Sequence, residues 1–221
     1  LPMVVLFVLG GIQGAIGWLM VKSGLVPEKY FVGHVELTTH FVAALGLLVY
    51  TLWFALRLLV PEQQSIHSPA LKKFTVVLLL LLFVQLCYGG FMAGLRAATV
   101  APTWPTINGE WFPASLFNER GPANLVNNPF MVHFIHRGLA YLIVILIIGW
   151  FISIQKTALS PWLHKTKILP LVLVLAQVLL GICTVLYSAS ATALVWFGVL
   201  HQFTAMLLLV SLVWVLYLVR K

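Results

Sequence analysis

The sequence has few charged residues and no aspartate. Only 8% of its 221 residues are charged, and all five acidic residues are glutamates. Soluble globular domains carry about 25% charged residues, so a soluble fold is excluded. The absence of aspartate excludes the paired-aspartate magnesium motifs of membrane prenyltransferases, the catalytic pair of aspartyl proteases and aspartate-based proton relays.

Cysteine is also scarce. Cys87 and Cys183 both lie within apolar segments, so the sequence offers neither a disulfide between loops nor a cysteine cluster for a metal. Each is predicted to be a small buried apolar residue. The net charge of +8 rests on so few residues that it bears on membrane orientation, and no nucleic-acid partner is predicted.

Apolar residues make up 62% of the sequence, and the mean hydropathy is +1.05. A helix that crosses a membrane needs about 20 such residues. Six segments meet this length: approximately Pro2–Val21, Val35–Val60, Leu71–Leu95, Pro129–Ile154, Ile168–Tyr187 and Ala191–Val219. The sequence therefore predicts an all-α polytopic membrane protein with six transmembrane helices, surrounded by the lipid bilayer.

The distribution of lysine and arginine predicts the orientation. Arg137 lies within a span and is set aside; eight cations then fall on one side of the membrane, namely Arg57, Lys72, Lys73, Lys156, Lys165, Lys167, Arg220 and Lys221. Four fall on the other side: Lys22, Lys29, Arg96 and Arg120. The richer side is expected to be cytoplasmic, or the matrix side in a mitochondrion, with both termini of this chain. The connection 96–128, rich in tryptophan and proline, is expected outside as an amphipathic loop on the membrane surface.

A glutamine followed four residues later by a glycine recurs in the first, third and fifth segments. The pairs are Gln13 with Gly17, Gln85 with Gly89, and Gln177 with Gly181. The two residues of each pair share one helix face. Two interpretations stay open: close helix packing with a hydrogen bond across the interface, or direct contact with a bound ligand.

Each of these segments is followed by one with a histidine near its outer end: His40, His136 and His201. The three lie at a common depth of roughly 10–14 Å. An ionisable side chain within a span is costly and indicates function. With no carboxylate cluster beside them, three imidazoles at one level favour axial ligation of haem iron. Three separately hydrogen-bonded core histidines, or a zinc or copper site, are the alternatives.

A haem b needs two facing histidines. His136 and His201 are the natural pair, because the fifth and sixth segments form a tight hairpin. In a protein of two pseudo-symmetric four-helix halves, the partner of His40 would lie two spans before the span of His40, and therefore upstream of Leu1, so that two helices would be missing. On this interpretation, residues 1–95 contain the remainder of the N-terminal half and the first helix of the next pair, and residues 71–221 form a C-terminal four-helix bundle that binds haem b.

Three further residues are candidates for the same sites. Arg137 could pair with a haem propionate or extend to the membrane interface. His133 is one helical turn from His136 and could support it or contact a propionate. Glu36 precedes His40 by four residues, where it could tune that imidazole or act as an acid or base; a glutamate is also favourable at a helix N-terminus.

Five stretches of the sequence resemble the haem A synthase family, in the family's order. They are Gly11-Ile-Gln-Gly-Ala-Ile-Gly-Trp-Leu-Met-Val-Lys-Ser-Gly24; Val84-Gln-Leu-Cys-Tyr-Gly-Gly-Phe-Met-Ala-Gly-Leu95 with Thr103-Trp-Pro-Thr-Ile-Asn-Gly-Glu-Trp-Phe-Pro113; Asn128-Pro-Phe-Met-Val-His-Phe-Ile-His-Arg137; Gln177-Val-Leu-Leu-Gly-Ile-Cys-Thr184; and His201-Gln202. Together they extend over nearly the whole chain.

The resemblance implies an eight-helix enzyme of two four-helix bundles, which oxidises the C8 methyl group of haem O to the formyl group of haem A through an alcohol and an aldehyde hydrate. It implies haem b between His136 and His201, and His40 as an iron ligand of the substrate haem. The family's other N-terminal histidine and its neighbouring glutamate belong to a span that this sequence does not contain, and Glu36 is not that glutamate. The chain is therefore expected to be a piece of a longer protein that lacks the first two helices.

The same resemblance implies the partners and the location. Haem O synthase and the assembly components of cytochrome oxidase are the expected partners, and a homo-oligomer is compatible with it. The location is a bacterial plasma membrane or the mitochondrial inner membrane, with the haem sites toward the outer side. Two other functions stay open: a bis-histidine b-type cytochrome that relays electrons from quinol, and a haem-binding assembly factor without catalysis. Haem O synthase itself would need an aspartate-rich diphosphate site, which this sequence lacks.

Overall fold

The computed structural model describes residues 2–220, and in that part of the chain the regular structure is helical apart from two isolated bridges. The elements in chain order are α1 (Pro2–Lys22), α2 (His34–Leu59), η1 (Glu62–Gln64), α3 (Pro69–Gly94), α4 (Ala97–Val100), η2 (Ala114–Phe117), α5 (Asn124–Asn127), α6 (Pro129–Ile154), α7 (Pro161–Thr166), α8 (Leu169–Leu186) and α9 (Ala191–Leu218). Here η denotes a short 3₁₀ helix.

Six helical stretches are long and apolar enough to cross a membrane, with mean hydropathies between 2.0 and 2.6. The predicted all-α, multi-pass membrane architecture is confirmed. The ends agree with the prediction to within two residues, except that the fifth stretch begins at Pro161 because the short helix α7 leads almost directly into α8. Proline favours the first turn of a helix, where its missing N–H costs nothing.

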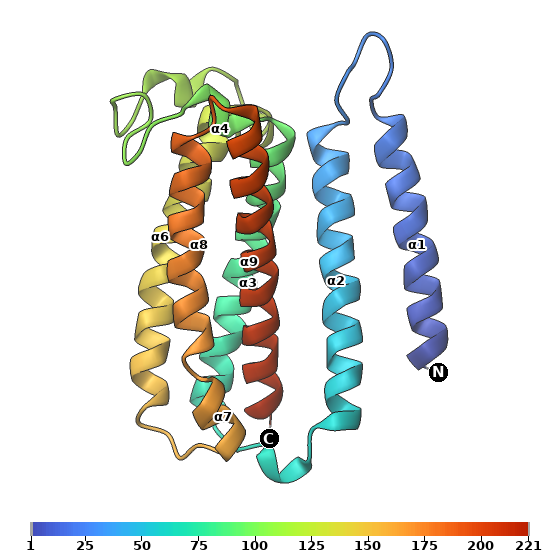
Figure 1. Ribbon diagram of the computed structural model, residues 1–221, viewed down its shortest axis with the longest axis vertical. Helices are drawn as coiled ribbons and strands as arrows, with labels where there is room; N and C mark the ends of the chain where they lie inside the picture. Colours follow the sequence, from blue (N-terminus) through green and yellow to red (C-terminus); the bar gives the residue numbers. More distant parts are fainter. Residues whose placement is uncertain (1, 221) are drawn as a thin grey trace.

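Four helices, α3, α6, α8 and α9, pack side by side into a bundle (Figure 1). Helix α3 packs against α6 and α9, and α8 packs against the same two. The core is apolar and well filled: Trp150 of α6 is fully buried, and its indole N–H donates to Thr75 Oγ1 of α3 at 3.0 Å. That bond satisfies the one polar atom of a large buried side chain.

Helices α1 and α2 form a hairpin beside this bundle (Figure 1). Helix α2 packs against α3 and α9, whereas α1 packs mainly against α2 and has no buried residue. The contact between α2 and α3 is close because Gly90 and Gly94 of α3 face Thr38 and His34 of α2. Small residues four apart allow two membrane helices to approach in this way. The division of the chain into an N-terminal and a C-terminal half stays a prediction.

The segment between α3 and α6 covers one end of the bundle, and η1 and α7 lie at the other end (Figure 1). The sequence indicated a long loop here; the structure adds α4, η2 and α5 to it, and all three pack against α6. Asn128 organises this end. Its Oδ1 accepts from the Phe130 N–H, which caps α6, and its Nδ2 donates to Ser115 O and Asn124 Oδ1.

Candidate functional site

The repeated glutamines lie against the three histidines, each on the helix that pairs with the histidine's helix. Gln13 Nε2 donates to His40 Nδ1 at 3.1 Å, Gln85 Nε2 to His136 Nε2 at 3.4 Å, and Gln177 Nε2 to His201 Nε2 at 3.1 Å. The structure thus supports hydrogen bonding across helix interfaces, the first of the two interpretations of the repeat, with a histidine as the acceptor in all three cases.

The repeated glycines make room for the imidazole rings. A methyl group built on Gly17 would lie 2.9 Å from His40 Cε1, and one built on Gly181 would lie 3.0 Å from His201 Cε1. At Gly89 the corresponding distance to His136 Cε1 is 3.6 Å, an ordinary contact. A spacing of four residues places each glycine one helical turn from its glutamine, on the same helix face. On that face the glutamine hydrogen-bonds to a ring nitrogen, and the glycine leaves room for the edge of the ring.

His136 and His201 face each other across the bundle. Their ring centroids are 6.4 Å apart, with an angle of 65° between the ring planes. Two imidazoles that ligate one metal ion from opposite sides, with metal–nitrogen bonds of about 2 Å, have ring centroids roughly 6 Å apart. The observed spacing matches that requirement.

A cavity of about 520 Å³ surrounds this pair. The volume falls within the range of cofactor pockets, about 300–1,000 Å³. The lining is mostly apolar and comes from α2, α3, α4, α6, α8, α9 and the 95–128 segment; its polar and charged members include Gln85, Gln177, His133, His136, His201, Arg96 and Arg137. No carboxylate lines it, so an occupant with an apolar body and negative charge would suit it.

The hydrogen bonds define the protonation of His201. Its Nδ1 lies 3.0 Å from the Gln177 carbonyl, which only accepts, so Nδ1 carries the proton. Nε2 is then unprotonated, and its lone pair accepts from the Gln177 side-chain amide, a hydrogen bond that a metal ion on Nε2 would replace. A histidine that ligates a metal typically donates its other N–H to a carbonyl in this way.

Several buried polar atoms around the histidines have no hydrogen-bond partner: the Oε1 atoms of Gln13, Gln85 and Gln177, and Nδ1 of His136. Buried polar groups are usually satisfied, so such atoms call for an explanation, of which a ligand is one. The facing imidazoles, the unprotonated Nε2 of His201 and the size of the cavity all fit a bis-histidine haem. We therefore regard the donor set as compatible with that group.

His40 lies outside this cavity. Its ring packs between α1 and α2, where Gln13 donates both to His40 Nδ1 and to the His40 carbonyl. Helix α2 contributes Leu37 and Phe41 to the cavity wall instead. No ring contact joins His40 to another histidine among residues 2–220. The geometry thus separates His40 from the other two histidines, and its role as an iron ligand stays a prediction.

Arg137 binds the segment between α3 and α6. Its guanidinium donates to the carbonyls of Thr103, Pro105 and Thr106 and, through Nε, to His133 Nε2 at 2.9 Å. His133 itself is buried, with 1% of its surface exposed. This network holds the loop of residues 103–106 over the cavity, a role that sequence reasoning did not find because carbonyl acceptors leave no mark in a sequence.

Glu36 lies in the first turn of α2, where its carboxylate packs beside Gly33. A negative charge at this end of a helix is favourable. No hydrogen bond to His40 is formed within the described residues. The structure therefore favours the helix-terminus interpretation of Glu36, and its role toward a haem stays a prediction.

The structure adds three lining residues that the sequence did not single out. Trp104, in the segment between α3 and α6, donates its indole N–H to the Tyr141 hydroxyl at 3.2 Å, and both residues line the cavity. Gly198 lies one turn before His201, and nothing is within 4 Å of a methyl group built on it. No pattern in the sequence indicated Gly198, because the residues three positions before His40 and His136 are Leu37 and His133.

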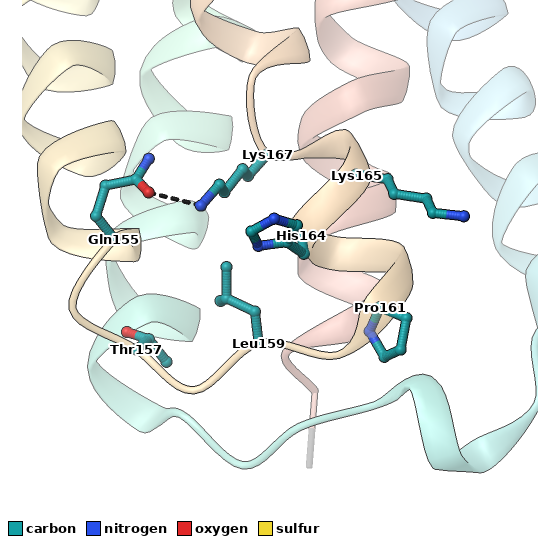
Figure 2. Close-up of a pocket in the computed structure, with 7 residues that line it drawn as sticks. All are labelled: Gln155, Thr157, Leu159, Pro161, His164, Lys165 and Lys167. Carbon is teal, nitrogen blue, oxygen red and sulfur yellow. Dashed lines mark hydrogen bonds between the residues drawn. The ribbon is translucent and has the colours of Figure 1, made fainter.

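A second cavity, of about 480 Å³, lies at the other end of the bundle (Figure 2). It is lined by Gln155, Thr157, Leu159, Pro161, His164, Lys165 and Lys167. Lys167 Nζ donates to Gln155 Oε1 at 2.6 Å across it. Among the described residues, this cavity has one histidine, His164, and no second histidine faces it. It therefore does not resemble the arrangement around His136 and His201.

A comparison with protein families matches residues 1–213 to the model of the cytochrome oxidase assembly protein family. Curated relatives include proteins named haem A synthase. One from Rhizorhabdus wittichii is 37% identical over 214 residues, which are 96% of this chain and 59% of the relative. One from Flavobacterium psychrophilum is 34% identical over 220 residues, 98% of this chain and 63% of the relative.

A third relative, the haem A synthase of Paracoccus denitrificans, is 35% identical over 187 residues, 82% of this chain and 49% of the relative. The chain therefore spans roughly half to two thirds of the length of these proteins. The family match takes in all three histidines and the glutamine and glycine beside each one. A six-helix membrane chain with this histidine arrangement, matched over residues 1–213, belongs to the cytochrome oxidase assembly protein family.

Proposed function

We propose that this chain takes part in the oxidation of haem O to haem A, in which a methyl group of the porphyrin becomes a formyl group. The observation that carries the proposal is the facing pair His136 and His201, 6.4 Å apart in a cavity of about 520 Å³. The names of the relatives, all haem A synthases, agree with it.

In this proposal His136 and His201 would hold a haem b through their imidazole nitrogens. That haem would supply one-electron redox chemistry when bound. The protein's part is to hold the two imidazoles against Gln85 and Gln177, to keep the proton of His201 on Nδ1 through the Gln177 backbone carbonyl so that Nε2 carries none, and to exclude water with an apolar wall. Two neutral nitrogen ligands in an apolar environment set the potential of such an iron.

His40 is proposed as a ligand of the substrate haem, at a separate site beside α1 and α2. Two observations support this: His40 has the same glutamine and glycine neighbours as His201, and it lies outside the cavity of the other pair.

The proposal extends to the setting of the protein. The excess of lysine and arginine at one end supports a topology with both termini of this chain on the cytoplasmic or matrix side and the histidines toward the outer side of a bacterial plasma membrane or mitochondrial inner membrane. Haem O synthase and other components of cytochrome oxidase assembly are the proposed partners.

Haem extracts of cells that depend on this protein for haem A would test the function. We expect His136→Ala and His201→Ala to abolish haem A and the bis-histidine haem spectrum of the purified protein. His40→Ala should abolish haem A while the haem b spectrum remains. His67→Ala is the matched control, because His67 is exposed and distant from the cavity.

The three candidate functions give different results in this experiment. Haem A that persists without the protein would refute an enzymatic role. Haem A that persists in His40→Ala would favour a non-catalytic assembly factor. A stable pair of b haems with no modified porphyrin, in the wild type, would identify an electron-relaying cytochrome instead.

A further inference from the structure

Arg96 is a cation at the cavity, and no acidic residue pairs with it among the described residues. It lines the cavity just beyond the end of α3. Within residues 2–220 its guanidinium forms neither a hydrogen bond nor an ion pair; its centre lies 4.9 Å from the ring centroid of Phe31, in the connection between α1 and α2. A guanidinium has five N–H donors, so Arg96 retains its full capacity for an anion.

The backbone at Arg96 is in an unfavourable conformation. Its φ of 53° and ψ of 35° are left-handed, at a position directly after a helix C-cap where glycine is usual. A residue with a Cβ is strained there, and glycine would relieve the strain. The sequence thus has an arginine at a position where the backbone conformation favours glycine.

The other guanidinium of the cavity is already engaged. Arg137 donates to His133 and to three carbonyls of the 103–106 loop, which occupies four of its five N–H groups. Of the two arginines that line the cavity, Arg96 therefore has the greater capacity to bind an anion. Because Arg96 is exposed, its unpaired charge is not buried.

The cavity itself indicates the kind of anion. Its wall is mostly apolar, its two cations belong to the outer end, and no carboxylate lines it. An occupant that fits has a large apolar body and acidic groups directed to that end. A porphyrin with two propionate carboxylates has this chemistry, and arginine is well suited to carboxylates.

We propose that Arg96 binds a propionate carboxylate of the porphyrin that occupies this cavity. This inference rests on the proposed function and specifies the residue that recognises the acidic edge of the ligand. Because Arg96 also stacks on Phe31, the bound carboxylate orders the connection between α1 and α2 against the end of α3. Arg96 thereby links the occupied bundle to the hairpin that carries His40.

The favourable effect of a cation at a helix C-terminus is a different explanation for Arg96, and it needs no ligand. The two explanations differ in what removal of the side chain does. A purely structural arginine would stabilise the ligand-free protein. An arginine retained for a carboxylate would stabilise only the complex, at the expense of the ligand-free backbone.

The test uses the purified protein in detergent, with haem b and haem b dimethyl ester as probes. The ester has no free carboxylate and retains the iron. We expect Arg96→Gly to weaken haem b binding about 10- to 100-fold, the loss of a charge-assisted pair, and to leave ester binding within about twofold of the wild type. The ligand-free variant should unfold at the same temperature as the wild type or above it.

Arg120→Gln is the matched control, because Arg120 is an exposed cation of the same connection that does not line the cavity. It should bind both probes as the wild type does. Equal weakening of both probes by Arg96→Gly, or no weakening of either, would overturn the assignment of Arg96 alone. A wild-type protein that binds neither probe with a bis-histidine spectrum would overturn the proposed function as well.

Discussion

At the scale of single residues, the site consists of histidines held by a glutamine amide and a glycine. The repeat places the same two neighbours beside His40, His136 and His201, but not at the same distance. The glycine distances differ by more than half an ångström between Gly181 and Gly89, which makes the two positions a natural comparison. The difference predicts which glycine tolerates a methyl group.

We expect Gly181→Ala to displace the ring of His201 and weaken haem binding, since the new methyl group would lie 3.0 Å from Cε1. With haem bound, His201 would keep the hydrogen bond from Nδ1 to the Gln177 backbone carbonyl, and the loss of this one bond, at about 0.5–1.5 kcal/mol, should reduce affinity about two- to tenfold. Haem titration followed by absorbance would measure it. Gly89→Ala, at 3.6 Å, should change affinity by less than about twofold.

Gly46→Ala in α2 is the control for helix propensity, because nothing lies within 4 Å of its new methyl group. Alanine favours a helix over glycine by up to about 1 kcal/mol, so this variant should be as stable as the wild type or more so. Equal affinities of Gly181→Ala and Gly89→Ala would show that the contact distance is not what holds the ring.

At the scale of elements, the α2–α3 contact joins the hairpin to the bundle. We expect Gly90→Val to separate the two helices, because even a methyl group there would lie 2.6 Å from Thr38 Oγ1, and Thr38 is only 4% exposed. Overpacking of this kind costs about 1–3 kcal/mol. Thermal unfolding in detergent would report the loss, and an unchanged transition would contradict the close approach.

The segment between α3 and α6, which Asn128 holds in place, gives a second prediction at this scale. Asn128→Ala removes the cap of α6 and the two donors that hold Ser115 and Asn124, and Asn128 is 2% exposed. We expect a destabilisation of about 2 kcal/mol, with faster hydrogen exchange in residues 114–128. Asn118→Ala, at an exposed position of the same segment, should alter neither quantity.

At the scale of the whole molecule, the six helices place the 95–128 segment at one end and α7 at the other. The positive charge bias predicts that the first end faces outward. Single cysteines would test this in a background without Cys87 and Cys183. Asn118→Cys should react with a membrane-impermeant maleimide added to intact cells, and Ala158→Cys should react only after lysis. The opposite pattern would reverse the orientation.

Long apolar runs made the six helices predictable, because a bilayer demands about 20 apolar residues from any helix that crosses it. The same reasoning missed the short helices α4, η2 and α5, because four residues each are too few to show a helical pattern and do not cross the bilayer. Of the site, the spacing of glutamine, glycine and histidine was visible, since residues four apart share a face. The sequence did not show which helix that face contacts.

The sequence alone therefore determined the membrane class and the number of spans in this chain. Only the tertiary structure decided that His136 faces His201 while His40 packs against α1, that Arg137 binds carbonyls of the outer segment, and that Arg96 adopts a left-handed backbone at the cavity. The physical reason is that periodicity specifies the faces of a helix, whereas pairing, carbonyl contacts and backbone angles arise only when those faces meet.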